Sequence, residues 1–122
     1  MGQLPRERRI RTRKEIGALL GSDRVRGSEL ELFSRPAVGG RSRGTCITPK
    51  FGRTSVARNR LRRRLKALIA EVLFERGEAR DWLVRIRPAA YERSYQELRA
   101  ELVGLADRLE RRPPQRSSES RE

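Results

Sequence analysis

The chain has 122 residues, enough for one domain with a modest core and too few for two. Its formal net charge of +14 comes mainly from arginine, whose planar guanidinium pairs with phosphates and stacks on bases. Nucleic acid is therefore the expected partner. A membrane surface is disfavoured, because the sequence has no long apolar run and no basic helix with a broad aromatic face.

Missing residue types exclude several kinds of chemistry. The chain has no histidine and a single cysteine, Cys46, so it lacks a His/Cys zinc site, a histidine-activated nucleophile and an internal disulfide. Cys46 lies in an apolar stretch and is predicted to be a buried small side chain. A polar, basic N-terminus in place of an apolar secretion segment predicts a cytoplasmic, reducing location.

The first residues carry charge before any regular structure. Residues 1–11 are basic and lack periodicity, which predicts an extended arm that either lies along RNA or stays mobile. Thr12 followed by Glu15 has the capping-box spacing, and it predicts a short helix that ends at Gly21.

Three short strands are predicted next, over residues 24–26, 29–35 and 45–48. The second alternates apolar and acidic side chains, and the third is rich in β-branched residues. Because a glycine-rich turn at 36–40 separates them, we expect the second and third strands to form a β-hairpin.

The C-terminal half continues with alternating elements. Residues 82–86 are nearly all apolar and predict a central strand, and Ser94 with Glu97 predicts a capped final helix that serves as scaffold. The expected order is α-β-β-β-α-β-α, a single α+β domain over residues 1–111 with helices on a small, mostly antiparallel sheet of three to four strands. Residues 112–122 are predicted to be a disordered polar tail.

The densest positive charge coincides with the clearest helical pattern, between residues 55 and 72. Apolar residues recur there at the spacing of a helix that buries one face: Leu61, Leu65, Leu68, Ile69, Val72 and Leu73. Basic side chains fall opposite this face or along its flank: Arg60, Arg62, Arg63, Arg64 and Lys66. Arg58 fits neither group, so it either precedes the regular helix or lies in a groove beside it.

Arginines at a helix N-terminus oppose the macrodipole, and like charges four residues apart repel by a few tenths of a kcal/mol per pair. Such a cost suggests an anionic partner for this helix. A basic face that is merely solvated is the alternative interpretation.

The segment KFGRTSVARNRLRRRLK, residues 50–66, resembles the signature of the bacterial ribonuclease P protein family, with RNR at 58–60. The LPRERRIRTRKE opening, the strand that carries Phe33 and DWLVRIRPAA followed by SYQELRAEL extend the resemblance over nearly the whole ordered chain. The resemblance implies a small sheet with an uncommon left-handed crossover. It also implies a subunit that joins a catalytic RNA to remove the 5′ leader from precursor tRNA, with Mg²⁺ held by the RNA and the substrate.

Site residues also follow from the resemblance. It implies RNA contacts by Lys50, Arg53, Arg58, Asn59, Arg60, Arg62, Arg63 and Lys66. It further implies a groove between the first helix and the sheet that holds the single-stranded leader on aromatic rings. Ile16 and Leu20 stand where the family usually carries phenylalanine, which leaves Phe33 as the main matching aromatic; all three have a role in the core as the alternative. Arg64 and Ala67 also depart from the family pattern.

Two other functions are compatible with parts of the sequence. A structural RNA-binding protein, such as a ribosomal or assembly factor, fits the charge and the fold equally well, and only the combination of motifs disfavours it. A protein-only nuclease needs clustered carboxylates to bind metal, whereas Asp23, Asp81 and Asp107 are scattered. The sequence predicts no catalytic residue and no metal site in the protein itself, and it identifies no protein partner.

Overall fold

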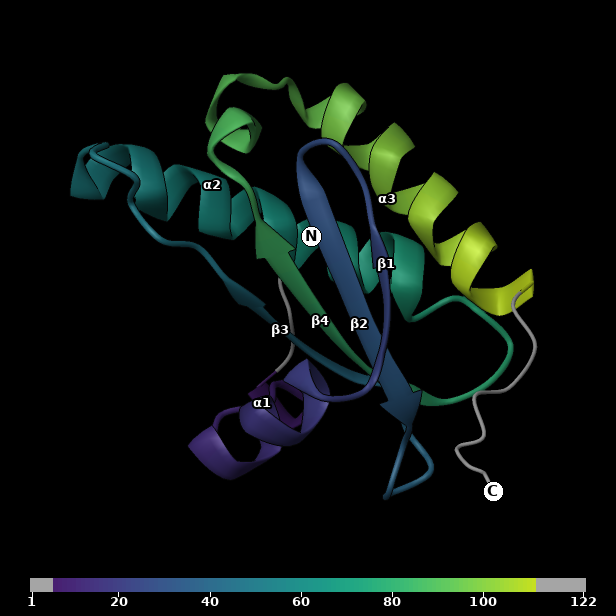
Figure 1. The fold of residues 1–122 in the computed structure, drawn as a ribbon. Coiled ribbons are helices and arrows are strands. Elements are labelled where there is room, and N and C mark those ends of the chain that lie inside the picture. The colour runs from purple at the N-terminus through teal and green to yellow at the C-terminus, as the bar shows by residue number, and fades with distance from the viewer. Residues whose placement is uncertain (1–5, 112–122) are drawn as a thin grey trace.

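The computed structural model describes residues 6–111 and contains three α-helices and four strands in the predicted α-β-β-β-α-β-α order (Figure 1). They are α1 (Arg13–Leu20), β1 (Asp23–Arg26), β2 (Leu30–Pro36), β3 (Arg43–Ile47), α2 (Ser55–Leu68), β4 (Arg80–Ile86) and α3 (Tyr95–Arg111). Short 3-10 helices lie at Arg6–Arg8 and Pro88–Glu92, and a π-helical turn at Ile69–Leu73 continues α2. The predicted polar tail, residues 112–122, lies outside the described residues.

The strands form one sheet in the order β1-β2-β4-β3. β2 pairs antiparallel with both β1 and β4, whereas β3 pairs parallel with β4. The predicted hairpin between the second and third strands is therefore wrong, although the predicted central position of β4 is confirmed. The physical reason lies in β4, which is buried on both faces of the sheet, so its backbone N–H and C=O groups need a strand partner on either edge.

A crossover through α2 joins the parallel neighbours β3 and β4. In Figure 1 the chain leaves β3, passes behind the sheet as α2 and returns in β4 on the right of β3. This is the left-handed sense that the resemblance implies, against the strong general preference for right-handed connections.

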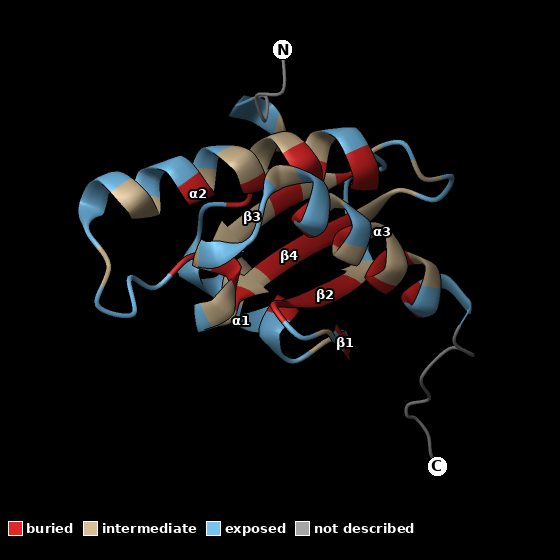
Figure 2. Ribbon diagram, turned by 90° about the horizontal axis from the view of Figure 1, so that it is seen from above, coloured by how far each residue is buried: buried red, intermediate tan, exposed pale blue. Residues whose placement is uncertain are grey.

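Helices cover the two faces of the sheet unequally (Figure 2). α2 and α3 lie on one face and enclose the main core, which includes Trp82, Val84 and the whole apolar stripe predicted for the basic helix. The short α1 covers part of the other face, where Ile10, Leu19, Phe33 and Leu83 form a second, smaller cluster. Among residues 6–111, no helix has the length and apolar character needed to cross a membrane.

The segment before α1 joins the edge of the sheet at β3. The Ile10 amide donates to the Gly44 carbonyl at 3.0 Å, Arg9 forms a parallel bridge with Gly44, and the Ile10 side chain is buried. The Arg8 Nε also donates to the Ser42 carbonyl at 2.9 Å. In place of the extended arm predicted over residues 1–11, residues 6–8 form a 3-10 helix and residues 9–10 dock on the sheet, because one apolar side chain and an unpaired strand edge hold them there. Residues 1–5 of that arm lie outside the described residues.

Candidate nucleic-acid interface

The basic helix α2 begins at a well-defined cap. Thr54 has an extended backbone, and its Oγ1 accepts from the Ala57 amide at 3.1 Å. The first turn contains no acidic residue, so no carboxylate offsets the positive end of the helix dipole. The start of α2 is consequently both rigid and strongly electropositive.

Arg58 lies inside α2, so it does not precede the regular helix, and its side chain reaches the segment that follows β3. Its Nε donates to the Thr48 carbonyl at 3.0 Å, and the side chain is half-buried. The bond ties the helix to the segment that follows β3. It also holds the guanidinium in one orientation, which lowers the entropy lost when that group binds an anion.

The other predicted contact residues of α2 form two groups. Asn59, Arg60 and Arg63 are exposed on the outer side of the helix, as the pattern predicts, while Arg62 and Lys66 are half-buried on its flank. Arg64 and Ala67, the two departures from the family pattern, are also half-buried, and the apolar stripe packs despite them.

Lys50 and Arg53 precede α2 and behave differently. Lys50 is exposed. Arg53 is already engaged, because its guanidinium pairs with Glu92 at 2.9 Å and lies 5.2 Å from the centre of the Tyr91 ring. Arg53 therefore holds the loop before α2 in place in addition to adding charge there.

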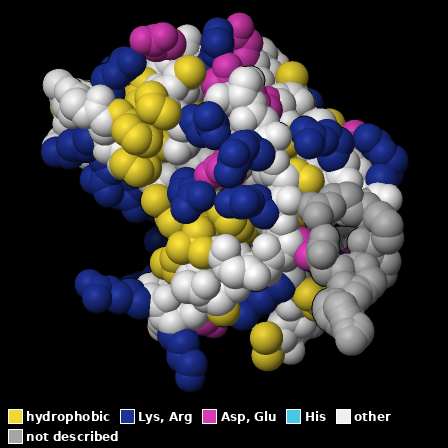
Figure 3. All heavy atoms as spheres, in the orientation of Figure 1, with side chains coloured by type: hydrophobic (Ala, Val, Ile, Leu, Met, Phe, Trp, Pro, Cys, Tyr) yellow, Lys and Arg dark blue, Asp and Glu magenta, His cyan; other side chains and the backbone are white. Residues whose placement is uncertain are grey.

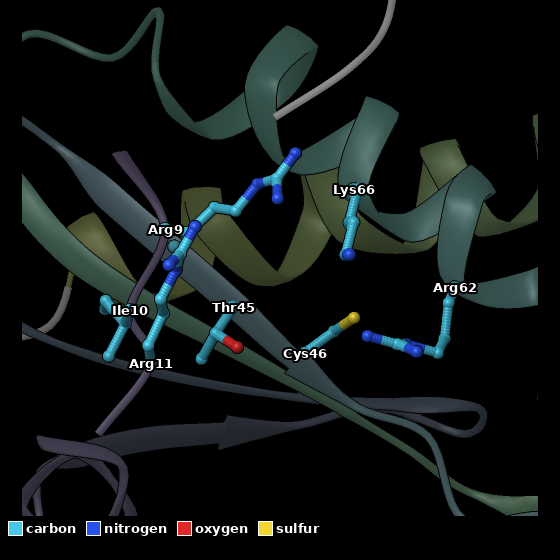
Figure 4. A pocket seen from close by; sticks show the side chains of 8 residues that line it. Arg9, Ile10, Arg11, Thr45, Cys46, Arg62 and Lys66 are labelled. Atoms are coloured by element: carbon cyan, nitrogen blue, oxygen red, sulfur yellow. The ribbon is translucent and has the colours of Figure 1, made fainter. Parts of the chain in front are cut away.

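A cavity of about 220 Å³ lies between the N-terminal segment, β3 and α2 (Figure 4). Its lining includes four basic side chains and no acidic one: Arg9, Arg11, Arg62, Lys66, with Ile10, Gly44, Thr45 and Cys46. Burial, then the charges of Arg62 and Arg9, lowers the pKa of Lys66. A phosphate group supplies the charge and acceptor oxygens that these converging donors require.

Cys46 lies in the wall of the same cavity. In Figure 4 its sulfur points toward the space between Arg62 and Lys66. Burial raises the pKa of the thiol, while the nearby Arg62 and Lys66 oppose that rise. Cys46 thus lines the cavity as a neutral thiol, and it is half-buried where the sequence predicted a buried side chain.

The sequence did not predict that Arg9 and Arg11 line this cavity, because their positions depend on the docking of residues 6–10 along β3. The available signal was Ile10, a lone apolar residue among basic ones.

The three predicted leader-groove residues lie on the α1 side of the sheet. Ile16 packs half-buried on the small cluster that contains Phe33, whereas Leu20 is 37% exposed. Figure 3 shows a hydrophobic patch beside α1 with Lys and Arg side chains around it. Phe33 itself is only 1% exposed, and the guanidinium carbons of Arg24 and Arg85 lie 5.9 and 5.1 Å from its ring centre. Arginines, not an open ring, therefore form the outer layer above Phe33.

Arginines on this side of the sheet are matched by carboxylates. The buried Asp81 pairs with Arg35 at 3.1 Å and with Arg43 at 3.0 Å, and Arg43 also pairs with Glu15 of α1 at 2.9 Å. Glu31 similarly accepts from Arg26 and Arg85. In the described part of the chain, no group of three or more His, Cys, Asp or Glu side chains is arranged to hold a metal ion.

Comparison with known proteins agrees with this arrangement. The sequence model of the Ribonuclease P family matches residues 4–110. The ribonuclease P protein component of Microcystis aeruginosa is 36% identical over 108 residues, covering 84% of this chain and 90% of the relative. That of Kocuria rhizophila is 33% identical over 96 residues, covering 78% of this chain and 85% of the relative.

Solved structures show the same fold. The RNase P protein of Staphylococcus aureus superposes with a TM-score of 0.73 at 16% identity, covering 82% of this chain and 93% of the other. That of Thermotoga maritima gives 0.70 at 20% identity, with 82% and 96% covered. The extent of the family match and the identity to the curated relatives lead to one conclusion: the chain belongs to the bacterial ribonuclease P protein family.

Proposed function

We propose that this chain works as the protein subunit of a ribonuclease P particle, an endoribonuclease in which an RNA subunit carries out the cleavage. The protein binds that RNA and the single-stranded 5′ leader of precursor tRNA, and so broadens the range of substrates. Beyond family membership, the observation that carries the proposal is the basic face of α2, where exposed Arg60 and Arg63 extend outward from a rigid helix start.

Charge neutralisation is the main physical contribution of this face. Each phosphate that pairs with an arginine releases condensed counterions, so binding is favourable and depends steeply on salt. The cavity beside α2, which four basic side chains line, can hold one phosphate group so that several donors surround it. An anion there would also oppose the burial and the neighbouring positive charges that lower the pKa of Lys66.

The catalytic chemistry is assigned to the RNA subunit, with Mg²⁺ held by that RNA and by the substrate. Phosphodiester cleavage by two metal ions requires carboxylates that are available as ligands. Two of the aspartates considered for a protein-only nuclease are engaged elsewhere: Asp81 pairs with Arg35 and Arg43 inside the sheet, and Asp107 pairs with Arg76 at 2.7 Å.

The leader is assigned to the α1 side of the sheet, along Ile16, Leu20 and the arginines above Phe33. A guanidinium stacked on an aromatic ring presents a flat, charged surface to a nucleobase. Leader binding in this protein therefore relies on arginine stacking more than on a bare aromatic platform. The proposal includes a cytoplasmic location, where a bacterial precursor tRNA is made.

The deciding experiment is cleavage of a precursor tRNA with a 5′ leader at low Mg²⁺, with the protein alone, a bacterial-type catalytic RNA alone, or both. We expect cleavage to rise strongly only in the mixture. Tight RNA binding without stimulation would favour the structural RNA-binding alternative, and cleavage by the protein alone would contradict the assignment of chemistry to the RNA.

A further inference from the structure

A strained turn comes immediately before the basic helix. The Arg53 amide donates to the Lys50 carbonyl at 2.9 Å, and the two residues between them, Phe51 and Gly52, have φ of 49° and 84°. Glycine adopts positive φ readily, but a bulky side chain does not. Phe51 is the one non-glycine residue with positive φ in the described part of the chain. Strain of this kind persists only where surrounding contacts enforce it.

Three side chains, those of Tyr91, Arg53 and Arg58, hold this turn through four contacts. The Tyr91 hydroxyl donates to the Pro49 carbonyl at 2.7 Å. Arg53 reaches Glu92 and the Tyr91 ring, and Arg58 of α2 donates to the Thr48 carbonyl. The turn is thus fastened to the 3-10 helix at Pro88–Glu92 and to α2, which fixes the position of the residue at its tip.

The side chain at that tip is nearly half exposed to solvent. Phe51 is 46% exposed, and Val56 in the first turn of α2 is 68% exposed. They are two of the four large hydrophobic side chains exposed in residues 6–111. Exposed basic residues lie nearby in sequence: Lys50 directly before Phe51, and Arg60 and Arg63 farther along α2. An aromatic ring in a strained backbone, exposed within a basic surface, gains nothing from core packing.

We propose that Phe51 is a stacking platform for an unpaired base of the RNA bound along α2. The inference rests on the proposed function and adds a specific contact to it. The basic surface selects a polyanion, and the ring then contacts a nucleobase, the apolar flat group that such a polyanion carries. Phe33 differs because it is buried under two arginines, so Phe51 offers the more open ring of the two.

Substitution separates stacking from folding. In Phe51→Gly the backbone strain disappears, so we expect a thermal midpoint at or above that of the unmodified chain, together with about 5- to 100-fold weaker binding of a bacterial-type catalytic RNA. Phe51→Leu keeps an apolar side chain without the ring and should also weaken binding. Val38→Ala, at an 82% exposed hydrophobic position beyond β2, is the matched control and should bind within twofold.

A direct signal comes from Phe51→Trp. The single native tryptophan, Trp82, is buried, so the unmodified chain is the reference for its emission. We expect an unstructured oligonucleotide to quench the added fluorescence and inorganic polyphosphate, which has charge but no bases, to leave it unchanged. Equal quenching by both, or affinities of Phe51→Leu and Phe51→Gly within twofold of the unmodified chain, would overturn the inference.

The outcomes also separate the two proposals. Stimulation of precursor cleavage without base-dependent quenching would reject Phe51 stacking and leave the proposed function intact. Base-dependent quenching without stimulation would reject the proposed function and keep the stacking contact.

Discussion

The two sides of the molecule use arginine in opposite ways. On the α1 side of the sheet, arginines pair with Glu15, Glu31 and Asp81 and hold strands and helix together. On α2, none of the arginines forms an ion pair with an acidic residue in the described part of the chain, and Arg60 and Arg63 extend into solvent. The arginines therefore have two roles: those on the α1 side form ion pairs within the domain, and those on α2 form a surface that can bind an external anion.

The largest effect expected from this difference is on stability, at the buried carboxylate. Asp81→Ala removes the buried carboxylate that Arg35 and Arg43 share and leaves Arg35 without its counter-charge, and we expect a loss of about 3–5 kcal/mol in the free energy of unfolding. Denaturant titration measures it. Arg60→Ala on α2 is the matched control and should change stability by no more than about 0.5 kcal/mol. Similar losses in both variants would remove the distinction between the two sides.

RNA binding should show the reverse pattern. If Arg58, Arg60 and Arg63 each neutralise a phosphate, the triple alanine variant should lose about three units of the slope of log affinity against log salt. Filter binding to a bacterial-type catalytic RNA across a salt series gives this slope. Arg99→Ala on α3, which removes a positive charge already paired with Glu71, should change it little. An unchanged slope in the triple variant would contradict phosphate contacts by these residues.

Leader recognition tests whether the α1 side also contacts RNA. Phe33→Leu keeps an apolar core residue and removes the ring beneath Arg24 and Arg85. We expect the assembled particle to bind precursor tRNA about fivefold more weakly, with mature tRNA unaffected, which corresponds to about 1 kcal/mol for a weakened stack. Equal losses for both RNAs would show that Phe33 serves only the core.

The smallest effect concerns pH. The hydrogen bond from Arg43 lowers the pKa of Glu15 below its usual value. A lowered folded-state pKa means that the ion pair stabilises the fold above the unfolded-state pKa, and that this contribution disappears as pH falls through the folded-state pKa. Thermal midpoints of the unmodified chain and of Glu15→Gln should therefore differ at neutral pH and converge in acid. A constant difference across the pH range would exclude the Glu15 charge as the cause.

Local signals in the sequence were sufficient for the elements themselves. The capping box at Ser94 and Glu97 forms in full, with Ser94 accepting from the Glu97 amide at 3.1 Å and Glu97 accepting from the Ser94 amide at 2.8 Å. The box at Thr12 forms differently: Thr12 Oγ1 accepts from the Glu15 amide, but its hydroxyl also donates to one oxygen of the Glu15 carboxylate, while Arg43 binds the other oxygen. A distant partner thus joins the local pair.

The sequence by itself determined the order of elements, the buried face of α2 and the position of its basic residues, because periodicity and capping act over a few neighbouring positions. Only the tertiary structure decided that β3 pairs with β4, that residues 6–10 dock on β3 and that Arg9 and Arg11 join Arg62 and Lys66 around one cavity. It also decided that Phe51 is exposed while Phe33 is covered. Each of these depends on which distant surfaces bury the most apolar area and satisfy the strand edges, and local pattern does not encode that choice.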